Sequence, residues 1–338
     1  MVGTLLLSFT IMSTKGSNFY HAFALHWASE GLLIPELPQA ELDAAEAAPS
    51  ASITIREEDP QRWPKLAGGS HDTPFLQMTR GDLRLKVEGI GRFRISNAEQ
   101  IAWQRADLSV SDQDLRTFLL GSAVGALMIQ RGMLVLHGNA LERDGEAIVC
   151  MGHSGAGKST LAYALMQQGW RLLADDLVSI TPDGQVLPGI PRIKLWHDAA
   201  KAFGLDPEAL PPIRQGMQKY LLLGEAIERA VQPCLLRALY LIRQQRRDSN
   251  DPDDSRITRI SSQKQAALCL RNQAFRRRFV RGLGQEGANF MALARRLQEA
   301  PLATLPTPRG IAAMQTWLKG QSLLSAAAEA QTTEEQTK

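Results

Sequence analysis

The feature that most constrains this chain is the stretch Gly152-His153-Ser154-Gly155-Ala156-Gly157-Lys158-Ser159, which fits the pattern G-x-x-x-x-G-K-[ST]. Glycines at this spacing let the backbone turn and bring its N–H groups close to an anion without an intervening Cβ. A helix that starts directly after such a loop adds the partial positive charge of its N-terminus. The pattern therefore predicts a phosphate-binding loop, in which Lys158 reaches the β- and γ-phosphates of a nucleotide and Ser159 holds Mg²⁺.

The residues around the loop decide between this interpretation and a purely structural glycine turn. Residues 147–151 form a short apolar run typical of a buried strand, and residues 160–166 favour a helix that Gly169 can cap. The order of strand, glycine loop and helix is the one that phosphate binding requires. We expect the nucleotide to contact Gly152, His153, Ser154, Gly155, Ala156, Gly157, Lys158, Ser159 and Thr160, with no role for the His153 side chain itself, because its position in the motif is variable.

A second candidate element is the apolar run that ends in Asp175 and Asp176. In a parallel sheet the end of this strand would lie beside the phosphate-binding loop, so one carboxylate can hold Mg²⁺ together with Ser159. We assign that role to Asp175 and expect Asp176 to accept the proton of an attacking hydroxyl, although the two roles could be exchanged. The alternative is a simple turn cap after a strand. The acidic residues follow the loop helix on the very next strand, earlier than in most phosphate-loop enzymes.

His137 is a third candidate, because it follows the apolar run 133–136 and precedes the loop by one hairpin with an Asp144-Gly145 turn. A lone histidine after a strand is usually structural, but this strand is expected to neighbour the loop strand, which leaves a role near the phosphates equally open. The basic residues Arg192, Lys194, Arg214 and Lys219 are candidates for contacts to phosphate or substrate, although each alone is more typical of an exposed charge. The cluster at 276–278 is interpreted as a solvated helix face, with an acidic partner or nucleic acid as the alternatives.

Composition indicates one large or two ordinary domains, since the chain has 338 residues of which 44% are hydrophobic. Alternating side chains in 83–87 and 91–95 predict a hairpin within a β-rich N-terminal domain, residues 1–110, for which Met12 is an alternative start. A helix capped by Ser111 opens a second α/β domain, residues 111–320. The tail, residues 321–338, is rich in Ala, Glu, Gln and Thr and is expected to be disordered.

The net charge, the cysteine content and the N-terminal residues indicate which binding partners and which cellular compartment to expect. A net charge of +3 gives no reason to expect nucleic acid, and the three scattered cysteines indicate reduced thiols in a cytoplasmic protein. The apolar run 5–12 lacks the preceding positive charge and the cleavage site of a signal peptide, and it is far too short to span a membrane. We therefore expect no membrane association, and a homo-oligomer is left open.

The order of His137-Gly138, the hairpin, the glycine motif and residues 169–176 resembles the catalytic domain of HPr kinase/phosphorylase. The N-terminal segment 29–37 and the long helix before His137 resemble the HPr kinase-related serine kinases, some of which occur with lasso-peptide and other modified-peptide biosynthesis. The resemblance implies a phosphate-loop α/β domain with a mixed sheet, akin to that of phosphoenolpyruvate carboxykinase. It also implies that Lys158, Asp176 and His137 are catalytic and that His137 lies near the transferred phosphate.

Residues 189–195 depart from the family pattern, because they keep little of the glycine-rich signature of the true HPr enzyme. This departure favours a substrate other than HPr and leaves phosphorolysis unassigned. The sequence therefore predicts an ATP- and Mg²⁺-dependent kinase that phosphorylates a serine of a protein or peptide, which could be a modified-peptide precursor. The alternatives are a small-molecule kinase on the same scaffold and a nucleotide-sensing module without turnover.

Overall fold

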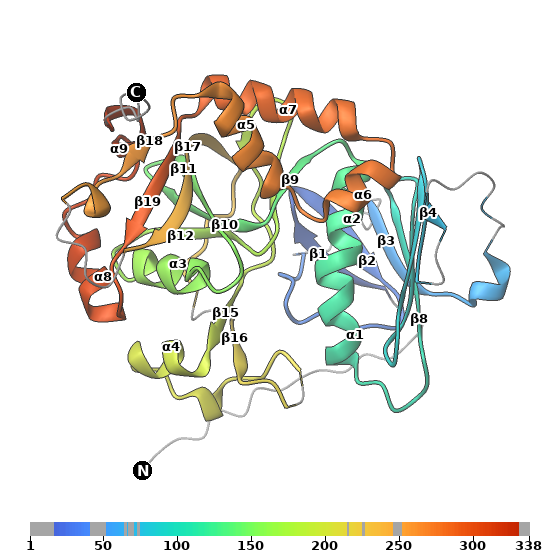
Figure 1. Cartoon of the computed structure of the whole chain (residues 1–338). Coiled ribbons are helices and arrows are strands. Elements are labelled where there is room, and N and C mark those ends of the chain that lie inside the picture. Colours follow the sequence, from blue (N-terminus) through green and yellow to red (C-terminus); the bar gives the residue numbers. More distant parts are fainter. Residues whose placement is uncertain are drawn as a thin grey trace, which may run out of the picture.

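The described part of the fold contains two large β-sheets that lie side by side, with helices packed on both (Figure 1). The computed structural model describes residues 17–40, 52–63, 66, 71–72, 75–214, 216–224, 227–245 and 252–330. The apolar run 5–12 and the alternative start Met12 lie outside these residues. Within the described ranges, no helix is long and apolar enough to cross a membrane.

The first sheet is built from the N-terminal part of the chain and has the strand order β1-β2-β3-β8-β7-β6-β5-β4. The expected hairpin is confirmed, because β6 pairs with β7 in antiparallel register. Parallel pairs occur where β3 joins β2 and β8. The strands are β1 (Asn18–Ala22), β2 (Leu25–Ser29), β3 (Ile53–Glu57), β4 (His71–Asp72), β5 (Leu76–Thr79), β6 (Asp82–Val87), β7 (Gly91–Ser96) and β8 (Gln100–Arg105).

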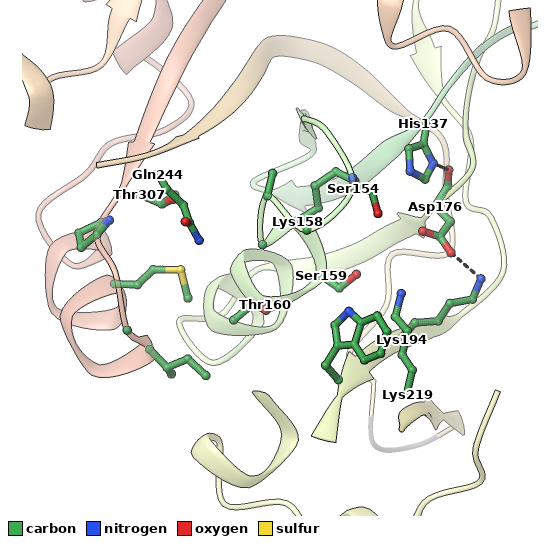
Figure 2. Close-up of a pocket in the computed structure, with 18 residues that line it drawn as sticks. His137, Ser154, Lys158, Ser159, Thr160, Asp176, Lys194, Lys219, Gln244 and Thr307 are labelled. Atoms are coloured by element: carbon green, nitrogen blue, oxygen red, sulfur yellow. Dashed lines mark hydrogen bonds and ion pairs between the residues drawn. The ribbon is translucent and has the colours of Figure 1, made fainter. Parts of the chain in front are cut away.

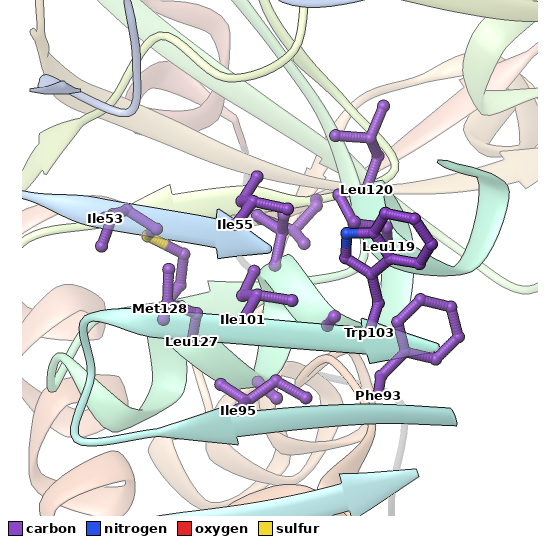
Figure 3. Packing of buried hydrophobic residues seen from close by; sticks show 14 of the residues in the cluster. Ile53, Ile55, Phe93, Ile95, Ile101, Trp103, Leu119, Leu120, Leu127 and Met128 are labelled. Atoms are coloured by element: carbon purple, nitrogen blue, oxygen red, sulfur yellow. The ribbon is translucent and has the colours of Figure 1, made fainter. Parts of the chain in front are cut away.

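A long apolar helical segment covers one face of the first sheet. It runs from α1 (Asp112–Phe118) through a π-helical turn, η2 (Leu119–Ala123), into α2 (Val124–Gln130). Ser111 caps α1 as expected, since its hydroxyl accepts a hydrogen bond from the amide of Asp114. Figure 3 shows the contact layer, in which leucines and a methionine of the helix lie against isoleucines and aromatic rings of β3, β7 and β8. The helix that we assigned to the second domain thus shares the hydrophobic core of the first sheet, and a boundary at residue 110 divides that core.

The second sheet is mixed and carries helices on both faces, which agrees with the expected α/β class. Strand β11 is parallel to β17, which is parallel to β19, while β10 is antiparallel to both β11 and β12. The strands are β9 (Leu134–Leu136), β10 (Gly138–Arg143), β11 (Glu146–Met151), β12 (Arg171–Asp175), β13 (Val178–Ile180), β14 (Gln185–Val186), β17 (Cys234–Gln244), β18 (Thr258–Arg259) and β19 (Leu302–Thr307).

The helices of the second sheet divide between its faces. Apolar residues of α3 (Lys158–Met166) and α8 (Ile311–Leu318) share one cluster, and those of α5 (Gln263–Asn272) and α7 (Glu286–Glu299) share another. The short helix α6 (Arg277–Gly282) lies between α5 and α7 in the chain. A separate hairpin of β15 (Arg192–Trp196) and β16 (Lys219–Leu223), with α4 (His197–Ala202) between its strands, projects below the second sheet in Figure 1.

The structure corrects the expectation of a disordered tail for residues 321–330. Leu323 and Ala327 are fully buried in the cluster of the second sheet, and α9 (Ala326–Glu329) forms there. The hydroxyl of Tyr240 donates a hydrogen bond to the carbonyl oxygen of Leu323 at 2.5 Å. The polar composition of the tail concealed the few apolar side chains that hold it to the core. Residues 331–338 lie outside the described residues.

Candidate active site

Residues 152–157, the glycine loop, connect the buried strand β11 to the first residue of α3. Gly155 and Gly157 have φ angles of 83° and 88°, in the left-handed region that side chains with a Cβ rarely adopt. A Cβ on Gly152 would lie 3.1 Å from the Cβ of Ala156, which is tighter than most such contacts, so a side chain there would have to displace its neighbour slightly. The conformation therefore explains why the motif needs glycine at these places.

Lys158 is the first residue of α3, and its ammonium group lies over the glycine loop. Its Nζ atom donates to the carbonyl oxygens of Gly152 and His153 at 3.0 and 3.1 Å. The side chain is largely buried, and this burial lowers the pKa of Lys158, although the carboxylates of Asp175 and Asp176 oppose the effect. A fixed positive charge thus lies where the sequence predicts contact with phosphate.

Asp175 ends strand β12, and three donors from different elements hold its carboxylate. Oδ1 accepts from Nδ2 of Asn139 at 2.5 Å and from the Ser159 hydroxyl at 3.2 Å, and Oδ2 accepts from the backbone amide of Lys194 at 3.0 Å. Burial, together with the charge of Asp176, raises the pKa of Asp175 to about 6. The structure therefore brings Ser159 and Asp175, the two expected ligands of Mg²⁺, into contact.

Asp176 has a strained backbone and lies directly after the last residue of β12. Its φ angle is 68°, which is uncommon for a residue other than glycine and is found most often at functional sites. The carboxylate forms an ion pair with Nζ of Lys194 (Figure 2). Burial alone would raise the pKa of Asp176, but the positive charges of Lys194 and Lys219 hold it well below its usual range. Asp176 is therefore ionised at neutral pH.

His137 lies beside the backbone of Asp176, because its strand β9 pairs with β13. Its Nδ1 atom is 3.0 Å from the carbonyl oxygen of Asp176. Burial, with the nearby charge of Lys158, lowers the pKa of His137, so the ring is neutral near pH 7. Because a carbonyl oxygen only accepts hydrogen bonds, Nδ1 carries the proton and Nε2 is an acceptor.

One cleft of about 390 Å³ joins these groups. At one end lie His137, Asp176, Lys194 and Lys219, and at the other lie Gln244 and Thr307, with the N-terminus of α3 between them (Figure 2). The complete lining consists of His137, Ser154, Gly155, Ala156, Gly157, Lys158, Ser159, Thr160, Asp176, Lys194, Trp196, Lys219, Gln244, Thr307, Pro308, Gly310, Ile311 and Met314. This main cleft is elongated past the glycine loop, with acidic and basic groups gathered at one end.

Of the residues expected to contact the nucleotide, 154–160 line the main cleft. Gly152 and His153 are not among its lining residues. The exposed His153 ring instead contacts the carbonyl oxygen of Ser154 at 2.8 Å. Gly152 contributes through its carbonyl group, which holds Lys158.

The four basic candidates lie in three different places in the structure. Lys194 and Lys219 line the main cleft, and the Lys219 ammonium lies 5.5 Å from the Trp196 ring centroid. Arg192 is buried with only 4% of its surface exposed, so it is not the surface charge that its sequence context allowed. Arg214 is directed to α1, where it forms an ion pair with Asp114 at 3.2 Å.

Several residues of the site were not identified from the sequence, among them Asn139, which holds Asp175, and the cleft residues Trp196, Gln244 and Thr307. Asn139 had one available signal, since it follows His137 and Gly138 at the start of the hairpin expected to neighbour the loop strand. Its register partner is Asp175. The other three come from distant strands, and nothing in their local sequence marks them.

The oxygen donors of Ser159 and Asp175 fit a cation such as Mg²⁺ that takes few ligands from the protein, rather than a metal ion bound by protein side chains alone. Among the residues that the structure describes, no group of three or more histidine, cysteine, aspartate or glutamate side chains could hold a metal ion. Mg²⁺ commonly takes one or two protein oxygens and completes its shell with water and substrate phosphates. The hydroxyl of Ser159 and the carboxylate of Asp175, 3.2 Å apart, supply such a pair.

Comparison with known proteins finds a partial sequence match and loose structural matches. No family model matches the chain. Over 71 residues, or 21% of this chain, it is 37% identical to an HPr kinase/phosphorylase of Clostridium beijerinckii, and the match spans about a quarter (24%) of that relative's length. The HPr(Ser) kinase/phosphatase of Coxiella burnetii aligns with 56% of this chain and 96% of its own, at 15% identity and a TM-score of 0.25, which is too low to carry an argument. The chain therefore resembles HPr kinase/phosphorylase over a segment of about a fifth of its length, as its sequence motifs predict.

Proposed function

We propose that this protein is an ATP-dependent serine kinase, which transfers the γ-phosphoryl group of Mg-ATP to a serine hydroxyl of a protein or peptide. One observation carries the proposal: a single cleft joins the glycine loop and Lys158 to an ionised carboxylate, that of Asp176, which lines the cleft. The partial match to an HPr kinase/phosphorylase supports phosphoryl-transfer chemistry for this arrangement.

The main cleft would take the nucleotide along its length. The N–H groups of the glycine loop, the N-terminus of α3 and Lys158 would hold the phosphates. The end near Gln244 and Thr307 would then take the nucleoside, because the acidic and basic groups gather at the opposite end. Ser159 and Asp175 would hold Mg²⁺, which when bound neutralises charge on the phosphate oxygens.

Asp176 would orient the acceptor hydroxyl and take its proton. The serine oxygen forms a bond to the γ-phosphorus as the bond to the β,γ-bridging oxygen breaks, and ADP leaves. Because the transition state of such transfers is loose, the hydroxyl loses its proton late, and a carboxylate with a low pKa can still receive it. Lys194 would keep Asp176 ionised and fixed, and Lys219 would add positive charge to the same end.

His137 would contribute through its unprotonated Nε2. With the proton held on Nδ1 by the carbonyl group of Asp176, Nε2 can accept a hydrogen bond from a water beside the acceptor hydroxyl. The same contact fixes the backbone of Asp176, so we propose that His137 also positions the base.

Labelling of a source-organism lysate with γ-labelled ATP tests the function. We expect wild-type protein to label at least one protein or peptide, and Lys158→Ala to label none. The matched control is Asp198→Asn, because the Asp198 side chain is fully exposed on α4 and should be dispensable. Label confined to a small molecule would instead favour a small-molecule kinase, and ATP binding without any labelled product would contradict the proposed transfer.

A further inference from the structure

A second cavity, of about 430 Å³, lies outside the main cleft between helices α5, α6 and α7. We name it the arginine groove, because its lining holds four arginines and a single acidic residue, Glu286. The complete lining is Arg271, Ala274, Arg277, Arg278, Val280, Arg281, Glu286, Asn289, Phe290 and Leu293.

The arginines of this groove carry charge that the protein itself leaves uncompensated. Among the described residues, none of the four forms an ion pair with a carboxylate, and Arg277 makes a 3.4 Å contact with the amide oxygen of Asn272. Arg277 and Arg281 lie one helical turn apart on α6, a spacing at which like charges destabilise a helix. All four side chains are exposed, so an acidic ligand can reach them.

The groove also offers apolar contacts beside its charges. Val280 and Leu293 form a buried apolar base, and Phe290 on α7 is 56% exposed at the wall. A large aromatic ring left in solvent next to unpaired guanidinium groups suits a ligand that has both acidic and apolar side chains. A nucleic acid fits less well, because Glu286 faces the same cavity and would repel its phosphates.

A direct backbone connection joins the arginine groove to the catalytic end of the main cleft. Ala274, which lines the groove, forms a β-bridge with Leu136, and the amide of His137 donates to the carbonyl oxygen of Gln273 at 2.8 Å. The segment between α5 and α6 therefore presents the groove on one side and supports His137 on the other. A peptide bound in the arginine groove would therefore contact the segment whose backbone holds His137.

We propose that the arginine groove docks an acidic segment, with at least one large apolar side chain, of the protein or peptide that accepts the phosphoryl group. Because the occupant is the acceptor, this inference rests on the proposed kinase function. Docking at a second site would raise the effective concentration of the acceptor hydroxyl at Asp176 without placing further groups in the main cleft. It would also let the protein recognise its acceptor through contacts that lie away from the reacting serine.

The first test measures binding without catalysis. The probe is a fluorescein-labelled peptide in which glutamates alternate with leucines, and its fluorescence anisotropy is followed in the absence of nucleotide. We expect wild type to bind it, and Arg277→Glu/Arg281→Glu to bind at least about tenfold more weakly, because charge-assisted contacts are replaced by repulsion. Phe290→Ser should weaken binding as well. The matched control Arg295→Glu changes an exposed arginine of α7 outside the groove and should bind as wild type does.

Three results would overturn the inference. The first is equal binding by wild type and Arg277→Glu/Arg281→Glu, or no binding by wild type. The second is equal affinity for a glutamate-glycine peptide of the same charge, which would show that the apolar wall has no role. The third is displacement of the probe by a short single-stranded RNA that binds more tightly. Thermal unfolding of each variant establishes that it is folded.

The second test separates the groove from the kinase function. In the γ-labelled lysate reaction, Arg277→Glu/Arg281→Glu should label the acceptor at least about tenfold more slowly when the acceptor is dilute, since docking contacts act on acceptor binding. Its affinity for ATP should not change. Undiminished labelling by this variant refutes acceptor docking, whereas peptide binding by a wild-type protein that labels nothing means that the proposed function has failed and that the groove has a different occupant.

Discussion

Replacement of Asp176 by asparagine should separate catalysis from nucleotide binding. Asparagine keeps the shape of the side chain but cannot take the proton of the acceptor hydroxyl. A positioned general base contributes about 10²–10⁴-fold to a rate, and we expect the rate of label incorporation to fall within this range. ATP affinity should stay the same or increase, because the variant removes a negative charge from the wall of the main cleft.

Asp176→Asn should also lower the free energy of unfolding, and the partial exposure of the ion pair limits the size of this loss. Removing one member of a buried ion pair costs about 3–5 kcal/mol, but the Asp176 side chain is 27% exposed and partly screened by solvent. We therefore expect a loss of about 1–3 kcal/mol in the free energy of unfolding. The double variant Asp176→Asn/Lys194→Met should recover part of this loss, because Lys194 no longer leaves a buried charge unpaired.

Two assays measure these effects: initial rates of label incorporation at saturating ATP, and urea unfolding followed by circular dichroism. Isothermal titration with a non-hydrolysable ATP analogue gives the nucleotide affinity. An Asp176→Asn enzyme with a rate within a few-fold of wild type would refute the role of this carboxylate as base. A large loss of nucleotide affinity would instead show that Asp176 serves the metal, and that the roles of Asp175 and Asp176 are exchanged.

The remaining predictions concern the scaffold of the site. Gly157→Ala should weaken ATP binding and destabilise the fold by about 1 kcal/mol, because its φ of 88° strains any residue with a Cβ; unaltered ATP titration would contradict this. Leu127→Ala should lower the free energy of unfolding by about 2–5 kcal/mol, since Leu127 is fully buried between α2 and the first sheet, and urea titration measures the change. Glu142 accepts hydrogen bonds from Arg171 and the amide of Gly145, which hold its pKa below the usual range. Its stabilising effect is present at neutral pH and is lost as the pH falls through that lowered pKa, so wild type and Glu142→Gln should differ in urea midpoint at pH 7 and converge in acid; a constant difference across the range would refute this.

The parts of the site that the sequence predicts are those encoded by contiguous residues. The glycine motif dictates its own backbone, because glycine is required where φ is positive, as at Gly155 and Gly157. His137 precedes the loop strand by one hairpin, so its nearness to the glycine loop follows from chain order. These short-range relations brought Lys158, Ser159, Asp175, Asp176 and His137 together in the prediction and in the structure.

The contacts that the sequence could not supply join residues far apart in the chain. Lys194 pairs with Asp176 only because β15, in the separate hairpin, lies beside the end of β12. No local pattern separates Lys194 from Arg214, which is directed to α1 instead. In the helix 112–130, residues 122–129 are buried on all sides, so periodicity cannot tell which sheet it covers. Leu323 and Ala327 likewise lie in a polar-looking tail, and only their packing reveals that they belong to the core.

The most direct test of phosphoryl transfer compares ATP labelled at the γ-phosphate with ATP labelled at the α-phosphate in the same lysate reaction. Acid hydrolysis of the labelled macromolecule then identifies the modified residue. The proposed function predicts phosphoserine from the γ-label alone, with wild type and not with Lys158→Ala. Label from the α-phosphate, label on a residue other than serine, or equal labelling by Lys158→Ala would contradict a serine kinase that acts through the glycine loop.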